Sequence, residues 1–167
     1  MNRFSLHDQA LEPARLIEQL RHPGCGGYVT FEGAVRDHNE GRRVLRLEYE
    51  AFAPLALREG ERILSAAAAR FGLTHALCAH RVGALAIGEL AVWVGVAAAH
   101  RGEAFDACRY VIDHVKHSVP IWKKEYYEDG DSGWVNCEAC AAAAAPHAGE
   151  PHAHGDSLPH HHGHRHG

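Results

Sequence analysis

Positively charged side chains gather in three short segments of the sequence, each of which could bind an anion. The first contains Arg36, with His38 behind it, after the small residues Gly33 and Ala34. Small residues let a ligand approach the backbone closely, and an arginine beside them could hold a phosphate through two parallel hydrogen bonds. From this segment alone, a solvated strand-end role for Arg36 remains the favoured alternative.

The second segment, His100 and Arg101, lies at the expected start of a helix. Free backbone N–H groups and the helix dipole attract anions at this end, whereas cationic side chains are unfavourable there. An anionic ligand would account for the pair. A capping role for His100, with Arg101 extending into solvent, is an equal alternative.

The third segment holds Lys116 at a predicted helix end, and Lys123 and Lys124 after Pro120 and Trp122. A lysine in the last turn of a helix often only compensates the dipole. Trp122 beside Lys123 would offer an aromatic face and a compact charge to a flat heterocycle that carries a phosphate. A lysine near other cations also loses its proton more easily and could act as a base or nucleophile.

A possible metal-binding pattern occurs near the C-terminus, where Cys137-x-x-Cys140 precedes eight histidines between His147 and His166. One CxxC pair is weak evidence for zinc, and the irregular spacing of the histidines is not that of a structural site. We therefore assign no specific metal site. Adventitious binding of zinc, nickel or copper is expected at the densest histidines: His160, His161, His162 and His164.

Hydrophobic periodicity predicts the elements that must position these segments. Strands are predicted at 4–6, 26–35, 45–50, 74–82, 89–99 and 134–135, and helices at 13–20, 54–71 and 103–117, with Gly72 as a C-cap. A polar loop at 37–43 would join the second and third of these strands into an antiparallel hairpin, and a glycine-containing turn would join the fourth and fifth. The order predicts an α+β fold with helices packed on a mostly antiparallel sheet.

Composition limits the class of protein further. The 167 residues predict one domain at 1–137 and a disordered tail rich in Ala, His and Gly at 138–167. No apolar run is long enough to span a membrane, and the net charge of −4 argues against a general nucleic-acid binder. No secretory signal is evident, so a cytoplasmic protein without disulfides is expected, with three of its five cysteines as packing residues.

Three stretches together resemble the large, catalytic subunit family of molybdopterin synthase. They are FEGAVRDHNEGRRVLRLEYEAF, HRVGALAIGELAVWVGVAAAHRGEAF, and VKHSVPIWKKE with a downstream GWV. The resemblance covers roughly residues 26 to 135. It implies an α/β-hammerhead-like fold and the transfer of two sulfurs to cyclic pyranopterin monophosphate, which forms the dithiolene of molybdopterin.

The resemblance also implies partners and site residues. Sulfur would arrive as a thiocarboxylate on the C-terminal Gly-Gly of a small ubiquitin-like subunit, two of which would flank a dimer of this chain, with no cofactor required. The implied catalytic residues are Lys116 and Lys123. The implied substrate-binding residues are Ala34, Val35, Arg36, His100, Arg101, Lys116, Lys123, Lys124 and Glu125.

Two other classes of function stay open at this point. A metal-binding protein would use the histidine-rich tail and would not need the cationic segments. A module that binds a phosphopterin without transforming it would keep the cationic segments but would not need a partner's glycine tail. The joint presence of all three segments favours the enzyme.

Overall fold

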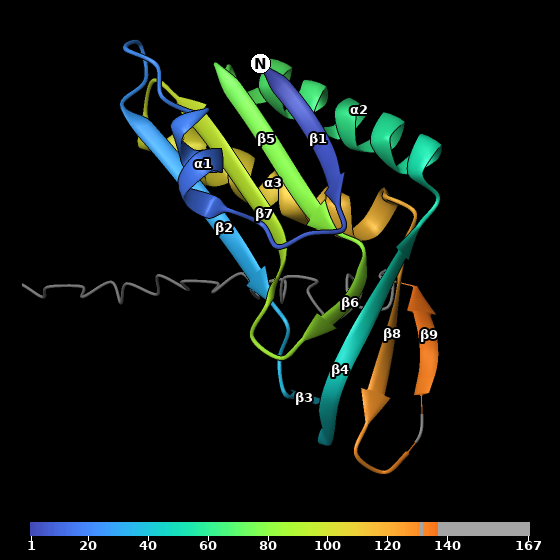
Figure 1. Ribbon diagram of the computed structural model, residues 1–167. Helices are drawn as coiled ribbons and strands as arrows, with labels where there is room; N and C mark the ends of the chain where they lie inside the picture. The colour runs from blue at the N-terminus through green and yellow to red at the C-terminus, as the bar shows by residue number, and fades with distance from the viewer. Residues whose placement is uncertain (131, 137–167) are drawn as a thin grey trace, which may run out of the picture.

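The computed structural model describes residues 1–130 and 132–136 (Figure 1). The elements in chain order are β1 (Asn2–His7), α1 (Pro13–Glu18), β2 (Gly27–Ala34), β3 (His38–Asn39), β4 (Arg42–Ala51), α2 (Ala53–Phe71), β5 (His75–Arg81), β6 (Gly83–Ala86), β7 (Leu90–Ala98), α3 (Arg101–Ser118), β8 (Ile121–Tyr127) and β9 (Ser132–Asn136). The predicted α+β class is confirmed. The expected tail at 138–167 with its histidines lies outside the described residues, and so does the Cys137–Cys140 pair.

The larger sheet has the strand order β1-β5-β7-β2 and is antiparallel except for the parallel pair β1 and β5. Helices α2 and α3 cover one face, and the short α1 lies over the other (Figure 1). The main core lies under α2 and α3, where Ile63, Leu64 and Val111 pack against Val94 of β7. Among residues 1–130 and 132–136, no helix combines the length and the apolar composition needed to cross a bilayer.

The first strand joins the sheet through residues far away in the chain. Phe4 of β1 lies opposite Cys78 of β5 in the parallel register. Its ring packs directly on Gly60 of α2, where an added Cβ would lie only 2.1 Å from Phe4 Cγ. The strand is therefore held both by the sheet and by the helix above it.

The smaller sheet has the order β3-β4-β8-β9, with β6 also pairing with β4. The predicted hairpin between β2 and β4 is therefore wrong, because the two strands lie in different sheets and β2 pairs with β7 along its length. Alternation shows which face of a strand is buried but does not select its partner. The polar loop instead makes a tight β3–β4 turn, in which Glu40 and Gly41 adopt φ values of 50° and 76°.

Besides the short β3, which lies in the expected polar loop, strands β6 and β8 were not predicted. A simple turn was expected where β6 lies, and no strand was expected at β8. The consecutive charged residues Lys123, Lys124 and Glu125 hid β8, because a strand with charge on both faces has no apolar periodicity.

Both long helices agree with their predictions. Helix α2 buries Ala56, Ile63, Leu64 and Ala67 on one stripe. It ends at Gly72, which has φ 64° and donates its N–H to Ala68 O, as expected of a glycine C-cap. Helix α3 begins two residues before the predicted start, a difference within the usual uncertainty of helix ends.

Candidate functional site

Buried His80, near the end of β5, marks the place where the two sheets meet. Its Nδ1 lies 2.7 Å from the backbone oxygen of Arg81 and donates a hydrogen bond to it. The ring of Tyr49, from β4 of the other sheet, contacts it edge-on with centroids 4.9 Å apart. Burial, together with the nearby charge of Lys116, lowers the pKa of His80 to about 3. The imidazole is therefore neutral, and its Nε2 is an acceptor.

Lys116 is half-buried in the last turn of α3, as predicted, close to His80 and Cys78. Burial raises the pKa of the Cys78 thiol, and the charge of Lys116 only partly opposes this effect. Cys78 is thus a neutral packing residue. Cys108 is buried as well and Cys25 partly so, in agreement with the packing role expected for three cysteines.

Lys123 lies on the face of β8 that is turned toward His80. It is the cross-strand partner of Tyr49, so both side chains are on the same side of the smaller sheet. The Nζ atom of Lys123 lies 2.9 Å from Glu125 Oε1, and the two side chains are only 12% and 6% exposed. Tyr49 and His80 therefore connect the surroundings of Lys123 with those of Lys116.

The carboxylate of Glu125 is held by several donors at once. Asn39 Nδ2 donates to Glu125 Oε2 at 2.8 Å, and the hydroxyl of Tyr127 donates to the same oxygen. Burial alone would raise the pKa of Glu125, but the hydrogen bonds from Tyr127, Lys123 and Asn39 and the charge of Lys123 outweigh it and lower that pKa. Glu125 is thus a charged, buried partner of Lys123.

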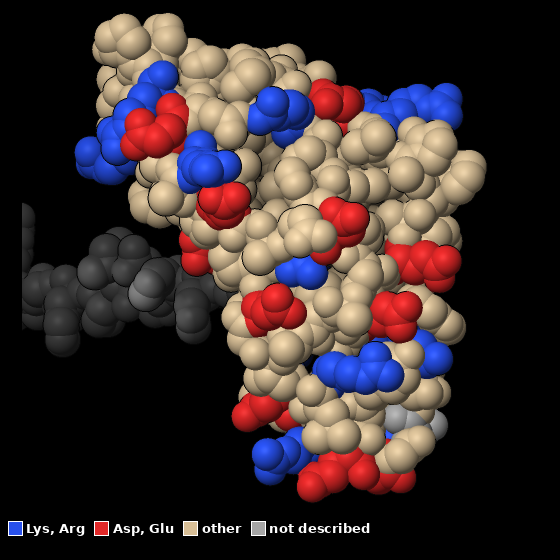
Figure 2. Space-filling model, viewed as in Figure 1, with Lys and Arg blue, Asp and Glu red and all other residues tan. Residues whose placement is uncertain are grey.

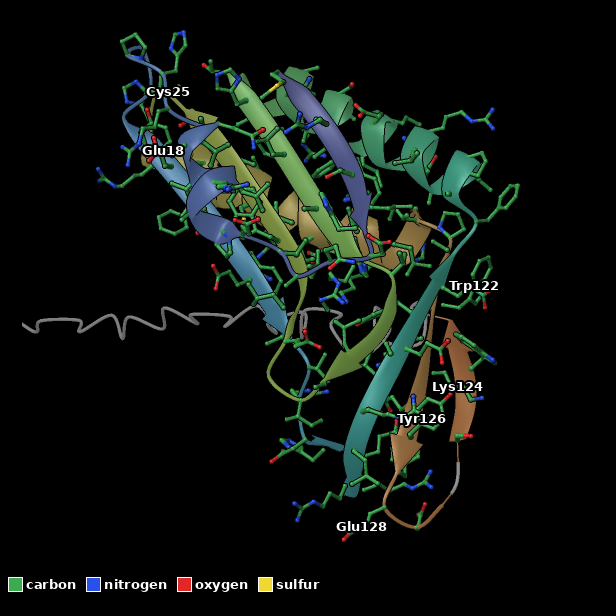
Figure 3. All side chains as sticks on the ribbon, viewed as in Figure 1. Glu18, Cys25, Trp122, Lys124, Tyr126 and Glu128 are labelled. Atoms are coloured by element: carbon green, nitrogen blue, oxygen red, sulfur yellow. The ribbon has the colours of Figure 1, made fainter. Side chains whose placement is uncertain are left out.

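Lys124 lies on the opposite face of β8 with Trp122 and Tyr126 (Figure 3). Its Nζ is 5.1 Å from the ring centre of Tyr126 and 5.7 Å from that of Trp134. The expectation that Trp122 and Lys123 would form one combined surface is therefore wrong, because neighbouring residues of a strand point to opposite faces. The structure separates Lys124 from Lys123 in the same way.

Arg36 follows the end of β2, and its side chain is exposed. Ala34 closes the strand at an irregularity in its pairing with β7. Val35 is buried; its N–H donates to Glu89 O at 3.0 Å and its carbonyl accepts from Gly88 N at 2.9 Å. The N–H of Val35 is therefore committed within the chain, and the exposed guanidinium of Arg36 is the group there that can reach a ligand.

His100 and Arg101 occupy the N-terminus of α3, as predicted, and both are exposed. They lie beside Gly27, at the start of β2, whereas Arg36 follows its far end. Eight strand residues span roughly 25 Å, so a single chain does not bring the pair next to Arg36. Acidic and basic residues alternate over the face in Figure 2, so any anion site must be built by a few local charges.

The site contains residues that the sequence analysis missed: His80, Asn39 and Tyr127. A histidine and an arginine at the end of the otherwise apolar strand THALCAHR could have drawn attention to His80. The contacts of Asn39 and Tyr127 depend on the pairing of distant strands and leave no local signal. Within the parts of the chain that the structure describes, no group of three or more His, Cys, Asp or Glu side chains could hold a metal ion.

Comparison with known proteins agrees with the resemblance. The model of the MoaE protein family matches residues 6–118. The "Molybdopterin synthase catalytic subunit" of Oryza sativa subsp. indica is 49% identical over 121 residues, which cover 72% of this chain and 63% of that protein. This chain thus spans somewhat less than two thirds of the rice relative.

Solved structures show the same fold. Molybdopterin synthase from Staphylococcus aureus superposes with a TM-score of 0.76 at 34% identity, covering 81% of this chain and 98% of the other. A complex of subunits 1 and 2 of molybdopterin-converting factor from Helicobacter pylori matches with a TM-score of 0.64 at 22% identity, covering 75% and 86%. The second likeness is one of fold. The family model, which matches more than half of the chain, shows that this chain belongs to the MoaE protein family.

Proposed function

We propose that this chain transfers sulfur to cyclic pyranopterin monophosphate as the catalytic subunit of a molybdopterin synthase. The names of its relatives support the reaction. The observation that carries the proposal is the junction of the two sheets, where Lys116 and Lys123 come from separate elements on either side of neutral His80. Two ammonium groups in partly dry surroundings suit an anionic substrate and an anionic sulfur donor.

The two lysines take different roles in this proposal. Lys116, in the last turn of α3, polarises the acyl carbon of the thiocarboxylate and stabilises the oxyanion that develops there. Lys123 holds an anionic group of the pterin, with Glu125 keeping the ammonium in place. Neutral His80 adds no charge and keeps an acceptor beside Lys116.

Arg36 and the His100–Arg101 pair bind phosphate in the proposal, but not within the same chain. A pterin phosphate is much shorter than β2, so the two ends of that strand cannot hold one molecule together. In a dimer of this chain, the pair of one copy would complete the site of the other. Lys124 faces outward and takes no part in holding the substrate of its own chain.

The sulfur donor in this proposal is a small ubiquitin-like subunit whose C-terminal Gly-Gly thiocarboxylate enters the junction. The word "subunit" in the names of relatives, and the two-subunit complex from Helicobacter pylori, support a partner of this kind. The transfer needs no organic cofactor, because the thiocarboxylate already carries activated sulfur. We place the reaction in the cytoplasm, with residues 1–137 as the catalytic domain.

Reconstitution with the thiocarboxylated small subunit tests the function. The wild-type chain should convert cyclic pyranopterin monophosphate to molybdopterin, and Lys116→Ala should lose about 100-fold or more of the turnover. His117→Ala is the matched control, because His117 is the exposed neighbour on the same turn. If the wild type bound the pterin but formed no product, the chain would be a phosphopterin-binding module and not an enzyme. Full turnover by Lys116→Ala would show that this lysine does not have the proposed role.

A further inference from the structure

We propose that Asn39 is a positioning residue that, with Tyr127, sets the place of the Lys123 ammonium by occupying one oxygen of Glu125. This inference rests on the proposed function, because it takes Lys123 as a substrate-binding group. Asn39 acts on Lys123 through the carboxylate of Glu125, which both side chains contact. The relevant contacts all lie on the buried face of β8 and at the β3–β4 turn.

The two oxygens of Glu125 have separate partners. Oε2 accepts from Asn39 Nδ2 and from the Tyr127 hydroxyl, whereas Oε1 lies 2.9 Å from Lys123 Nζ. A carboxylate with no other donors can rotate and bring both oxygens onto one ammonium. With Oε2 occupied from two sides, Glu125 presents Oε1 to Lys123, which fixes the side from which the carboxylate meets the ammonium.

Asn39 also connects Lys123 to the segment that carries Arg36. Asn39 lies three residues after Arg36, and between them Asp37 O accepts a hydrogen bond from Val44 N at 2.8 Å. The bond from Asn39 to Glu125 thus joins the connection after β2 to the interior of β8. It fixes two of the proposed anion-binding groups relative to each other.

A second tether of the same turn provides a matched control. Arg42 binds Asp129 through two nitrogens at 2.8 to 3.1 Å, on the exposed side of the turn. Asp129→Asn weakens this tether but keeps Arg42, whose guanidinium lies 3.7 Å from the ring centre of Tyr127, and it changes none of the three donors of Glu125. If Asn39 served only to hold the β3–β4 turn in place, weakening either contact would reduce pterin affinity equally.

The experiment measures the affinity of the purified chain for cyclic pyranopterin monophosphate by tryptophan fluorescence, together with KM, kcat and the melting temperature. The variants are Asn39→Ala, Tyr127→Phe and Asp129→Asn, each also combined with Lys123→Met. Asn39→Ala and Tyr127→Phe should each weaken binding roughly tenfold, because each removes one of the two donors that hold the same oxygen of Glu125. The change should appear in KM more than in kcat, and Asp129→Asn should bind as the wild type does.

The Lys123→Met background separates positioning from general stability. If Asn39 acts through Lys123, then Asn39→Ala should add no further loss of affinity once that lysine is gone. An equal tenfold loss in both backgrounds, or an equal loss in Asp129→Asn, would overturn the inference. Wild-type affinity in Asn39→Ala would overturn it too, while a wild-type chain that neither binds nor converts the pterin would refute the proposed function itself.

Discussion

The two faces of β8 carry similar residues in opposite circumstances. On the inner face, Lys123 and Glu125 form a buried ion pair that further donors complete. On the outer face, Lys124 lies near aromatic rings and Tyr126 donates its hydroxyl to Glu48 at 3.0 Å. Adjacent lysines in one strand therefore have different surroundings, and only the inner one is placed to act in a partly dry site.

This difference shows that position relative to the sheet, more than residue type, decides what a charged side chain can do. In water, a charge is screened and an ion pair contributes little. On the buried face of the smaller sheet the same charges interact strongly, and each needs a side chain of opposite charge or a hydrogen-bond partner. Equivalent substitutions on the two faces should therefore differ in their effects.

Removal of the inner carboxylate should have the largest effect. Glu125→Leu takes away the carboxylate partner of Lys123 and should lower the free energy of unfolding by about 3–5 kcal/mol. Glu48→Leu, on the outer face, removes only the acceptor of Tyr126 and should cost about 1 kcal/mol. Urea unfolding followed by tryptophan fluorescence measures both; equal losses would mean that the faces do not differ in this respect.

Removing the lysine of the inner face should lower the enzymatic activity, whereas removing the lysine of the outer face should not. Lys123→Ala should reduce turnover in the reconstituted reaction roughly 100- to 1,000-fold, the usual result of losing one preorganised electrostatic group. Lys124→Ala should show no resolvable loss, because its ammonium lies near the rings of Tyr126 and Trp134 on the outer face. Circular dichroism of both variants must show a folded chain. A comparable loss in Lys124→Ala would bring the outer face into the site.

Lowering the pH should destabilise the folded chain through His80, which is buried on the inner side of the smaller sheet. The pKa of this imidazole is about 3 in the folded chain against 6.5 when it is free, so protonation favours the unfolded state. Its contribution is complete above pH 6.5 and falls by about 1.4 kcal/mol per pH unit as pH decreases toward 3. The free energy of unfolding, measured from pH 7 to pH 4, should therefore fall less steeply in His80→Phe than in the wild type. Identical slopes would contradict the buried, neutral ring.

The smallest effect is expected on the outer face at Arg46. Its guanidinium lies 3.6 Å from the ring centre of Tyr126, a cation–π contact that contributes about 0.5–1 kcal/mol at an exposed site. Arg46→Ala should lower the melting temperature by a few degrees at most, as differential scanning calorimetry would show. Arg43→Ala, at an exposed position of the same strand, is the control. A loss as large as that of Glu125→Leu would show that the outer face is not merely a solvated surface.

The sequence predicted the elements with strong apolar periodicity. Helix α2 and its Gly72 cap, helix α3 with His100 and Arg101 at its start, and the buried strands β5 and β7 all lie where expected. These segments were predicted correctly because each buries one continuous apolar stripe or run.

The remaining errors concern partners that lie far apart in the chain. The pairing of β2 with β7 rather than β4 depends on the whole sheet, and periodicity alone carries no such information. Strand β8 was missed because the middle of its buried face is formed by Lys123 and Glu125, which pair with each other. The same is true of the site: its lysines could be named from the sequence, but the neutral imidazole of His80 between them could not.

The parallel pairing of β1 with β5 has a consequence for the order in which the chain folds. Phe4 has its partner strand only after residues up to Arg81 have been synthesised, because β5 ends there. Closing the long loop between β1 and β5 costs chain entropy. The packing of Phe4 on Gly60 also requires that α2 has formed. During translation β1 therefore stays unpaired, with its apolar side chains exposed, until the middle of this sequence has been made.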